Sequence, residues 1–189
     1  MKVLNKSFFE RDTAEVAKDL IGKILVRRFG KKLASGRIVE TEAYYGEKDP
    51  ASRAHGRKKF RAKWKECGKT FIYMVHGNWL LNITAHEKGK VGAVLIRALE
   101  PLKGIELMRK NRGTSEILDL TNGPGKLTQA LRIDKSLNEK SVTSKQSEIF
   151  IADGIKLKIS SSHRIGVKKD LRRKLRFFAV DNPFVSRKS

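Results

Sequence analysis

The stretch KILVRRFGKKLASGRIVETEAYYG, residues 23 to 46, decides how the fold begins. Residues 23–29 contain a short apolar run, Ile24 to Val26, and predict a strand, and residues 30–32 predict a turn. The chain then returns as a second apolar run over residues 33–41. Two such runs joined by a short turn indicate a β-hairpin, so antiparallel pairing is expected from the start of the sheet.

The rest of the sequence mixes short strands with a few helices. Helices are expected at residues 13–20 after the capping residue Asp12, from Pro101 onward, and at 123–131. Further strands are expected at 71–75, 79–84 and 91–100, and in the segments EIFIADG, IKLKIS and LRFFAV. Short strands in hairpins with helices against them are typical of an α+β fold, and we expect one domain over residues 1–189.

The composition indicates a globular but strongly basic protein. The chain carries 42 Lys and Arg against 20 Asp and Glu, a formal net charge of +22. No apolar run approaches the ~20 residues of a membrane-spanning helix, and the opening MKVLNKSFFERD does not resemble a signal peptide. We therefore expect a cytoplasmic protein with no membrane partner, associated with the nucleoid if the source is a prokaryote. The single cysteine, Cys67, excludes an internal disulfide.

Basic side chains concentrate in two runs. Residues 53–69 hold eight Lys and Arg and residues 164–176 hold seven, with one acidic residue in each run. A solvated face is the ordinary explanation of one such run. Two runs in a chain with a charge of +22 favour contact with nucleic-acid phosphates instead, and Arg57 and Lys58 are expected to take part.

Two acids stand close together at the end of the second apolar run. Glu40 and Glu42 are two residues apart on a predicted strand, so their side chains share one face. Adjacent like charges destabilise each other unless a cation lies nearby or the pKa of one is raised. Two solvated glutamates on an edge strand would also explain the pair. However, Tyr44, Tyr45 and the basic loop add the aromatic and cationic groups that a base-excising DNA site requires.

The chain resembles the alkyladenine (3-methyladenine) DNA glycosylase family in five blocks that follow the family's order. These blocks are RIVETEAYYG (37–46), DPAS (49–52), FIYMVHGNWLLNIT (71–84), VLIRALEP (94–101) and NGPGKLTQALRIDKS (122–136). The tail RFFAVDNPFVS (176–186) also fits, so the resemblance covers nearly the whole chain.

The resemblance implies both a fold and an activity. The implied fold is a curved, mostly antiparallel sheet with flanking helices and a protruding β-hairpin. The implied activity is that of a monofunctional DNA glycosylase, which flips alkylated or deaminated purines out of double-stranded DNA and excises them to initiate base excision repair. The implied substrates are 3-methyladenine, 7-methylguanine and hypoxanthine.

The same resemblance assigns the chemistry to Glu42 and Arg97. Glu42 would act as the general base, deprotonating the water that attacks C1′ of the sugar and steadying the oxocarbenium-like transition state. Arg97 would orient Glu42 and the water. A cation inside the apolar run VLIRALE is costly unless it has a partner, although an ordinary ion pair would satisfy it. Spacing alone does not choose between Glu40 and Glu42; the family's pattern selects Glu42.

The resemblance also supplies a base pocket. Tyr44 and Tyr73 would sandwich the extruded base, and an aromatic face attracts a cationic alkylated purine by about 0.5–2 kcal/mol. Tyrosines in strands are commonly core residues, which is the alternative here. Asn82 would lie at the pocket wall and disfavour the amino group of an undamaged guanine. A satisfied buried amide explains Asn82 equally well.

Three further residues are expected to contact DNA. His76 occupies the hairpin tip, where the family inserts a wedge into the minor groove, although a solvated turn residue is the alternative. Gly125 and Lys126 begin a predicted helix whose amides would meet a phosphate. Leu127 stands where a nucleotide-binding P-loop needs Ser or Thr, so that motif is excluded; a plain glycine-proline turn is the remaining alternative.

One departure from the family affects the expected substrate preference. The family commonly places histidine after DPAS, whereas this chain has Arg53 there and His55 two residues further on. An arginine beside a cationic base is electrostatically unfavourable. Either Arg53 donates hydrogen bonds to a neutral base such as hypoxanthine, or it turns to a phosphate and His55 takes the pocket.

Other classes of protein fit the sequence less well. A zinc nucleobase deaminase needs two cysteines spaced P-C-x-x-C, which one cysteine excludes, and the four histidines lack metal-ligand spacing. We expect no metal and no cofactor. A non-catalytic basic nucleic-acid-binding module would explain the charge but not Glu42 and Arg97. The abundant lysines do not exclude a strand-nicking lyase, although a carboxylate and water favour a monofunctional enzyme. A monomer is the simplest expectation.

Overall fold

The structure is a computed structural model that describes residues 1–57 and 64–186. Within these residues, eight strands form one antiparallel sheet in the order β3-β4-β5-β2-β1-β6, and β8 pairs with both β2 and β7. The strands are β1 (Ile24–Phe29), β2 (Lys32–Tyr45), β3 (Thr70–Val75), β4 (Asn78–Thr84), β5 (Gly92–Lys103), β6 (Ile149–Ala152), β7 (Ile159–Ser162) and β8 (Arg176–Ala179).

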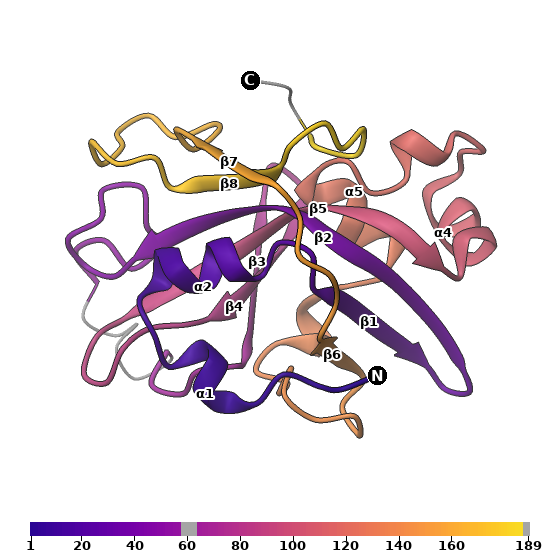
Figure 1. The fold of residues 1–189 in the computed structure, drawn as a ribbon, viewed down its shortest axis with the longest axis horizontal. Helices are drawn as coiled ribbons and strands as arrows, with labels where there is room; N and C mark the ends of the chain where they lie inside the picture. The colour runs from indigo at the N-terminus through magenta and orange to yellow at the C-terminus, as the bar shows by residue number, and fades with distance from the viewer. Residues whose placement is uncertain (58–63, 187–189) are drawn as a thin grey trace.

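Short helices lie against this sheet, as Figure 1 shows. They are α1 (Lys6–Phe9), α2 (Thr13–Asp19), α4 (Ile105–Arg112) and α5 (Pro124–Ala130), with single 3₁₀ turns at η1 (Ile117–Asp119) and η2 (Lys135–Leu137). The expected cap of α2 is present, because the Asp12 side chain accepts hydrogen bonds from the amides of Ala14 and Glu15. No helix of the described residues is long and apolar enough to cross a membrane.

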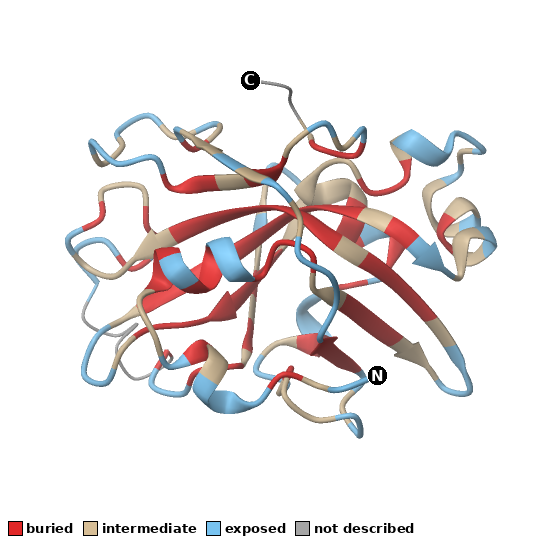
Figure 2. Ribbon diagram, in the orientation of Figure 1, coloured by how far each residue is buried: buried red, intermediate tan, exposed pale blue. Residues whose placement is uncertain are grey.

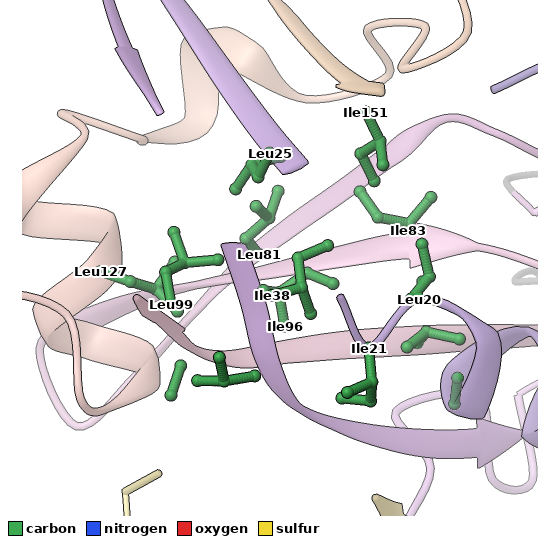
Figure 3. Close-up of a cluster of buried hydrophobic side chains, with 14 of the residues drawn as sticks. Leu20, Ile21, Leu25, Ile38, Leu81, Ile83, Ile96, Leu99, Leu127 and Ile151 are labelled. Atoms are coloured by element: carbon green, nitrogen blue, oxygen red, sulfur yellow. The ribbon is translucent and has the colours of Figure 1, made fainter. Parts of the chain in front are cut away.

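A single large core lies between the sheet and the helices. Figure 2 shows buried residues along the middle of β2 and β5, and the close-up in Figure 3 shows side chains from the sheet meeting others from α5 and the end of α2. Leu81, Ile96, Leu99 and Leu127 are fully buried in this cluster. Burying each aliphatic side chain contributes about 1.5–3 kcal/mol, so this core holds the long strands in place.

The strongly curled antiparallel sheet with few flanking helices confirms the α+β fold, but some boundaries differ from the expected ones. Pro101 does not open a helix: β5 continues through it to Lys103, and α4 begins only at Ile105. Leu102 therefore lies near the end of this strand, where it is exposed. The segment IKLKIS is also a strand only from Ile159 onward.

The expected hairpin of β3 and β4 is present, but its turn has two residues rather than the three, 76–78, that lay between the expected strands. Val75 lies opposite Asn78, and His76 and Gly77 between them both have positive φ angles, 46° and 75°. Positive φ at both central residues is the conformation of a type I′ turn, which matches the twist of the flanking strands. Glycine adopts it without cost, whereas His76 is held there under strain.

The pairing of β2 with β5 contains three irregularities, and two of them, which are adjacent, shape the centre of the molecule. Ile38 lies opposite Leu99, Glu40 opposite Ala98, and Thr41 opposite Ile96. Each strand therefore carries one extra residue, Val39 on β2 and Arg97 on β5, which makes two adjacent β-bulges. Bulges redirect side chains, and here they bring a charged residue of β5 beside the acids of β2.

Candidate active site

Arg97 joins the two acids of β2. Its Nε donates to Oε1 of Glu40 at 2.9 Å, and its Nη1 lies 3.3 Å from Oε2 of Glu42. The side chains of both acids have no exposed surface, and that of Arg97 is only 9% exposed. The expectation that the two carboxylates share one face is therefore confirmed, and they are not the solvated pair of an edge strand. Glu40 and Glu42 supply the partners that Arg97, a buried cation, requires.

Glu40 is the more completely neutralised of the two acids. In addition to Arg97, Arg176 donates from Nε to Oε1 at 2.8 Å, and the amide of Ser186 donates to Oε2 at 2.7 Å. Burial by itself raises the pKa of Glu40, but Arg97, Arg176 and Ser186 outweigh it and hold the pKa below its ordinary value. Glu40 is therefore an ionised internal counter-ion for two arginines.

Glu42 has fewer cationic partners and a different proton affinity. The hydroxyl of Tyr44 donates to Oε2 at 2.7 Å, and the amide of Ile165 donates to Oε1 at 2.7 Å. Burial raises the pKa of Glu42 above its ordinary value, and Arg97 and these two hydrogen bonds offset that effect only in part. Of the two acids, Glu42 is therefore the one whose surroundings favour accepting a proton.

A cavity of about 690 Å³ opens in front of Glu42. All three of the groups that contact the Glu42 carboxylate belong to residues that line it: Tyr44, Arg97 and Ile165. Tyr73 lines the same cavity from β3. Glu42 thus lies behind the wall of this cavity. Tyr44 and Tyr73, the two tyrosines expected to sandwich the base, both line it.

The two predicted stacking tyrosines each carry an arginine against one ring face. The guanidinium carbon of Arg164 lies 4.5 Å from the ring centre of Tyr44, and that of Arg53 lies 5.2 Å from the ring centre of Tyr73. Burial raises the pKa of both phenols, so both hydroxyls remain protonated at neutral pH. Tyr73 also contacts the ring of Phe71, with 5.2 Å between the ring centres, and both tyrosines line the cavity.

Asn82 lies at the foot of the hairpin and does not line the cavity. It is almost fully buried, and its side-chain amide donates to the carbonyl oxygen of Phe71 at 3.2 Å. Its expected role beside the base stays a prediction; in this structure its side chain contacts the strand backbone and Tyr73.

Arg53 and His55 line a second cavity, of about 370 Å³, rather than the one in front of Glu42. The two cavities share Tyr73, so Arg53 contacts the base-pocket wall from the other side. His55 is tied to the carbonyl of Glu47 at 2.8 Å. Arg57 lines the second cavity as well, whereas Lys58 lies outside the described residues.

The rim of the first cavity brings together the residues expected to bind DNA. His76 is exposed at the hairpin tip, and Gly125 and Lys126 at the start of α5 line the same opening. Lys126 is not free to act alone, because its ammonium group pairs with Asp119 and donates to Asn122 at 3.0 Å. A phosphate at this position would have to compete with Asp119 or share the lysine with it.

The sequence does not reveal three buried charged residues of this region: Arg164, Arg176 and Asp49. Arg164 and Arg176 were grouped with the phosphate-binding run, but both are buried and paired with carboxylates. Asp49, the buried partner of Arg164, enters the sequence analysis only as part of DPAS (49–52), with no role of its own. Asp49 is 115 residues from Arg164 and Glu40 is 136 residues from Arg176, so no local pattern reveals these two buried ion pairs.

A buried carboxylate behind an aromatic-walled cavity, in a strongly basic chain, is an arrangement suited to removing a base from DNA. The comparison with protein families agrees. Residues 7–183 match the model of the methylpurine-DNA glycosylase family. The chain belongs to this family.

Similar proteins cover nearly the same length. Three that carry the provisional name 3-methyladenine DNA glycosylase come from Salinibacter ruber, Prosthecochloris aestuarii and Mesorhizobium japonicum. They are 39%, 40% and 43% identical to this chain, over 98%, 97% and 93% of it and over 97%, 91% and 86% of their own lengths. The chain is therefore an enzyme, a DNA glycosylase that hydrolyses N-glycosyl bonds, and not a non-catalytic binding module.

Proposed function

We propose that this glycosylase excises alkylated and deaminated purines, namely 3-methyladenine, 7-methylguanine and hypoxanthine, from double-stranded DNA with a water activated by Glu42. It would act as a monomer, in the cytoplasm, within a single domain over residues 1–189. The observation that carries the proposal is the position of Glu42, buried behind a cavity whose walls supply its hydrogen-bond partners.

The chemistry needs Glu42 to accept one proton. Water attacks C1′ as the bond from C1′ to the purine nitrogen breaks, the departing base keeps the electron pair, and the water's proton passes to the carboxylate. A carboxylate has about four acceptor positions, of which hydrogen bonds from Tyr44 and Ile165 fill two, and Arg97 lies 3.3 Å from Oε2. The attacking water would occupy one of the others. Arg97, held by Glu40, keeps the acid ionised and oriented.

The tyrosines would hold the flipped base. Tyr44 and Tyr73 each have an arginine against one ring face, and both line the same cavity. A planar purine that enters between them gains stacking contact of about 1–3 kcal/mol per aromatic partner. Asn82 would discriminate against guanine through its contact with Tyr73 rather than by lining the pocket.

The rim would position the duplex. His76 at the hairpin tip would enter the minor groove and offset the unstacking cost of a few kcal/mol. Gly125 and Lys126, with Arg57 and Lys58 of the first basic run, would contact phosphates on either side of the flipped nucleotide.

The test is direct excision of single lesions. Duplexes that each contain one modified purine are incubated with the protein, and free base and abasic sites are measured. Release of 3-methyladenine, 7-methylguanine and hypoxanthine, without strand nicking, is expected. Binding without release of any of these bases would reject the proposal, and nicking without an added amine or base would reject the monofunctional mechanism.

A further inference from the structure

The most completely buried ion pair near the cavity is not one of the groups that contact Glu42. The side chains of Asp49 and Arg164 have no exposed surface, and two parallel hydrogen bonds of 2.7 and 2.8 Å join them. Asp170 adds a third bond, from Nε of Arg164 at 2.9 Å. Paired hydrogen bonds between a guanidinium and a carboxylate fix both position and angle, so this arginine has little freedom.

The ion pair ties two loops to the end of β2. Asp49 also accepts from the amides of Tyr45 and Ala51 at 2.9 and 3.0 Å. Arg164 donates in addition to the carbonyl of Ala43 at 2.9 Å. The ion pair therefore joins the loop that follows β2 to the loop that precedes β8. It also contacts Ala43 and Tyr45, the two neighbours of Tyr44 in the chain.

The ion pair lies beside both of the uncharged donors that reach Glu42. Ile165, whose amide donates to Oε1, is the next residue after Arg164. Tyr44, whose hydroxyl donates to Oε2, has its ring under the Arg164 guanidinium at 4.5 Å. If the ion pair were loosened, both hydrogen bonds to the acid would lengthen together.

We propose that the Asp49–Arg164 ion pair is a positioning device for the general base, because it fixes the Ile165 amide and the Tyr44 hydroxyl against the Glu42 carboxylate. The proposal rests on the proposed role of Glu42. Neither Asp49 nor Arg164 touches the carboxylate, so neither is a catalytic residue. Their effect would pass through the two donors.

A positioning role predicts a change that a purely structural role does not. The charged and titratable groups that face Glu42 are Arg97 of β5, Glu40 and Tyr44 of β2, Tyr73 of β3 and Arg176 of β8. All of them remain when the ion pair is altered. Weaker donation from Ile165 and Tyr44 favours the protonated acid, so the pKa of Glu42 would rise.

The experiment measures single-turnover excision against pH for the wild type, Asp49→Asn and Arg164→Lys, on the modified-purine duplex that the wild type cleaves fastest. Asp49→Asn keeps the size of the side chain and Arg164→Lys keeps the positive charge, but both lose the paired hydrogen bonds. Their acid limb is expected to move upward by about one pH unit. The control is Arg37→Gln, which breaks a half-buried ion pair of 2.7 Å with Glu100 that does not contact Glu42.

The outcomes separate the two proposals. A wild-type acid limb that Glu42→Gln does not abolish would overturn the role of Glu42 itself. The positioning role would be overturned if the acid limb of the pH profile depends on Glu42 but lies at the same pH in both variants as in the wild type, with only the rate lowered. Should both variants fail to fold, Asp170→Asn is measured in the same way. It weakens the hold on Arg164 through a partly exposed partner, and a shifted or unshifted acid limb supports or overturns the positioning role as before.

Discussion

Glu40 and Glu42 show how two identical side chains acquire different chemistry from their neighbours. Both are fully buried and both touch Arg97. Glu40 has a second arginine, and the pKa of its carboxyl is lowered, whereas Glu42 has a phenol and an amide, and its pKa is raised. The sequence predicts that the two acids share a face, but it does not reveal which one receives Arg176. That partner is 136 residues away from Glu40.

The raised pKa of Glu42 predicts the pH dependence of excision. A general base works only when it is ionised, so the rate should fall as pH falls through the pKa of Glu42 in the enzyme–DNA complex. Because burial raises that pKa, the fall should begin above the pH expected for an ordinary glutamate, ~4.3. Single-turnover rates across pH check this. A rate that stays constant down to the ordinary pKa of glutamate would contradict it.

Arg53 predicts a preference between cationic and neutral lesions. It is exposed and stacks on Tyr73, so a cationic base on the other face of this ring meets a second positive charge. Arg53→Met should therefore raise the excision of 7-methylguanine relative to hypoxanthine, by up to ~10-fold if most of one cation–π interaction is recovered. Competition between the two duplexes measures the ratio.

A matched control exists for this variant. Arg57 lines the same second cavity but has no aromatic contact among those observed, so Arg57→Met should lower affinity for both duplexes without changing their ratio. An unchanged ratio in Arg53→Met would remove Arg53 from substrate selection.

At the level of elements, the sequence predicts the hairpins well and the end of β5 poorly. Pro101 was expected to open a helix because proline is common at the first helical position. In the structure it lies opposite Gly36 of β2, and among the described residues β4 pairs with β5 only near residues 93–95. The missing amide of proline thus faces a side of β5 with no strand beside it, where proline is tolerated.

Contact between α5 and the hairpin tip predicts a variant that separates DNA binding from stability. A Cβ on Gly125 would lie 2.8 Å from Cγ of Asn78, so Gly125→Ala should push the start of α5 away from the hairpin. We expect DNA affinity to fall several-fold, because His76 and Lys126 line the same opening. Fluorescence anisotropy with a lesion duplex measures this affinity.

The control for this variant lies two residues earlier. A Cβ on Gly123 has no heavy atom nearer than 3.8 Å, and its backbone is extended, with φ −178°. Gly123→Ala should bind DNA as the wild type does. Equal losses in both variants would mean that the contact with Asn78 does not matter for binding.

At the scale of the whole molecule, the net charge of +22 predicts DNA binding but not which cations are available for it. Arg97, Arg164 and Arg176 are consumed by buried carboxylates, and Lys126 is paired with Asp119. Basic runs in a sequence therefore overstate the phosphate-binding surface. Only the folded chain brings distant acids to these arginines. The sequence therefore wrongly groups Arg164 and Arg176 with the phosphate-binding residues of the run 164–176.

The remaining surface charge predicts a steep dependence of affinity on salt. If the footprint includes about 6–10 phosphates, raising salt from about 50 to 200 mM should lower affinity by about 10³- to 10⁵-fold. Undamaged duplex should show a similar slope, since phosphate contacts carry no information about the lesion. Titrations at several salt concentrations measure the slope. An affinity that hardly changes with salt would contradict binding through phosphates.

The most direct test of the account is single-turnover excision by Glu42→Gln. The amide keeps the size of the side chain and a carbonyl oxygen that can accept a hydrogen bond, but it cannot take a proton from water. The account predicts that the variant binds the lesion duplex as the wild type does and releases base at least ~10²-fold more slowly. Glu87→Gln, a change at an exposed acid paired with Lys90, should keep the wild-type rate. Release of base by Glu42→Gln at the wild-type rate would contradict the central claim.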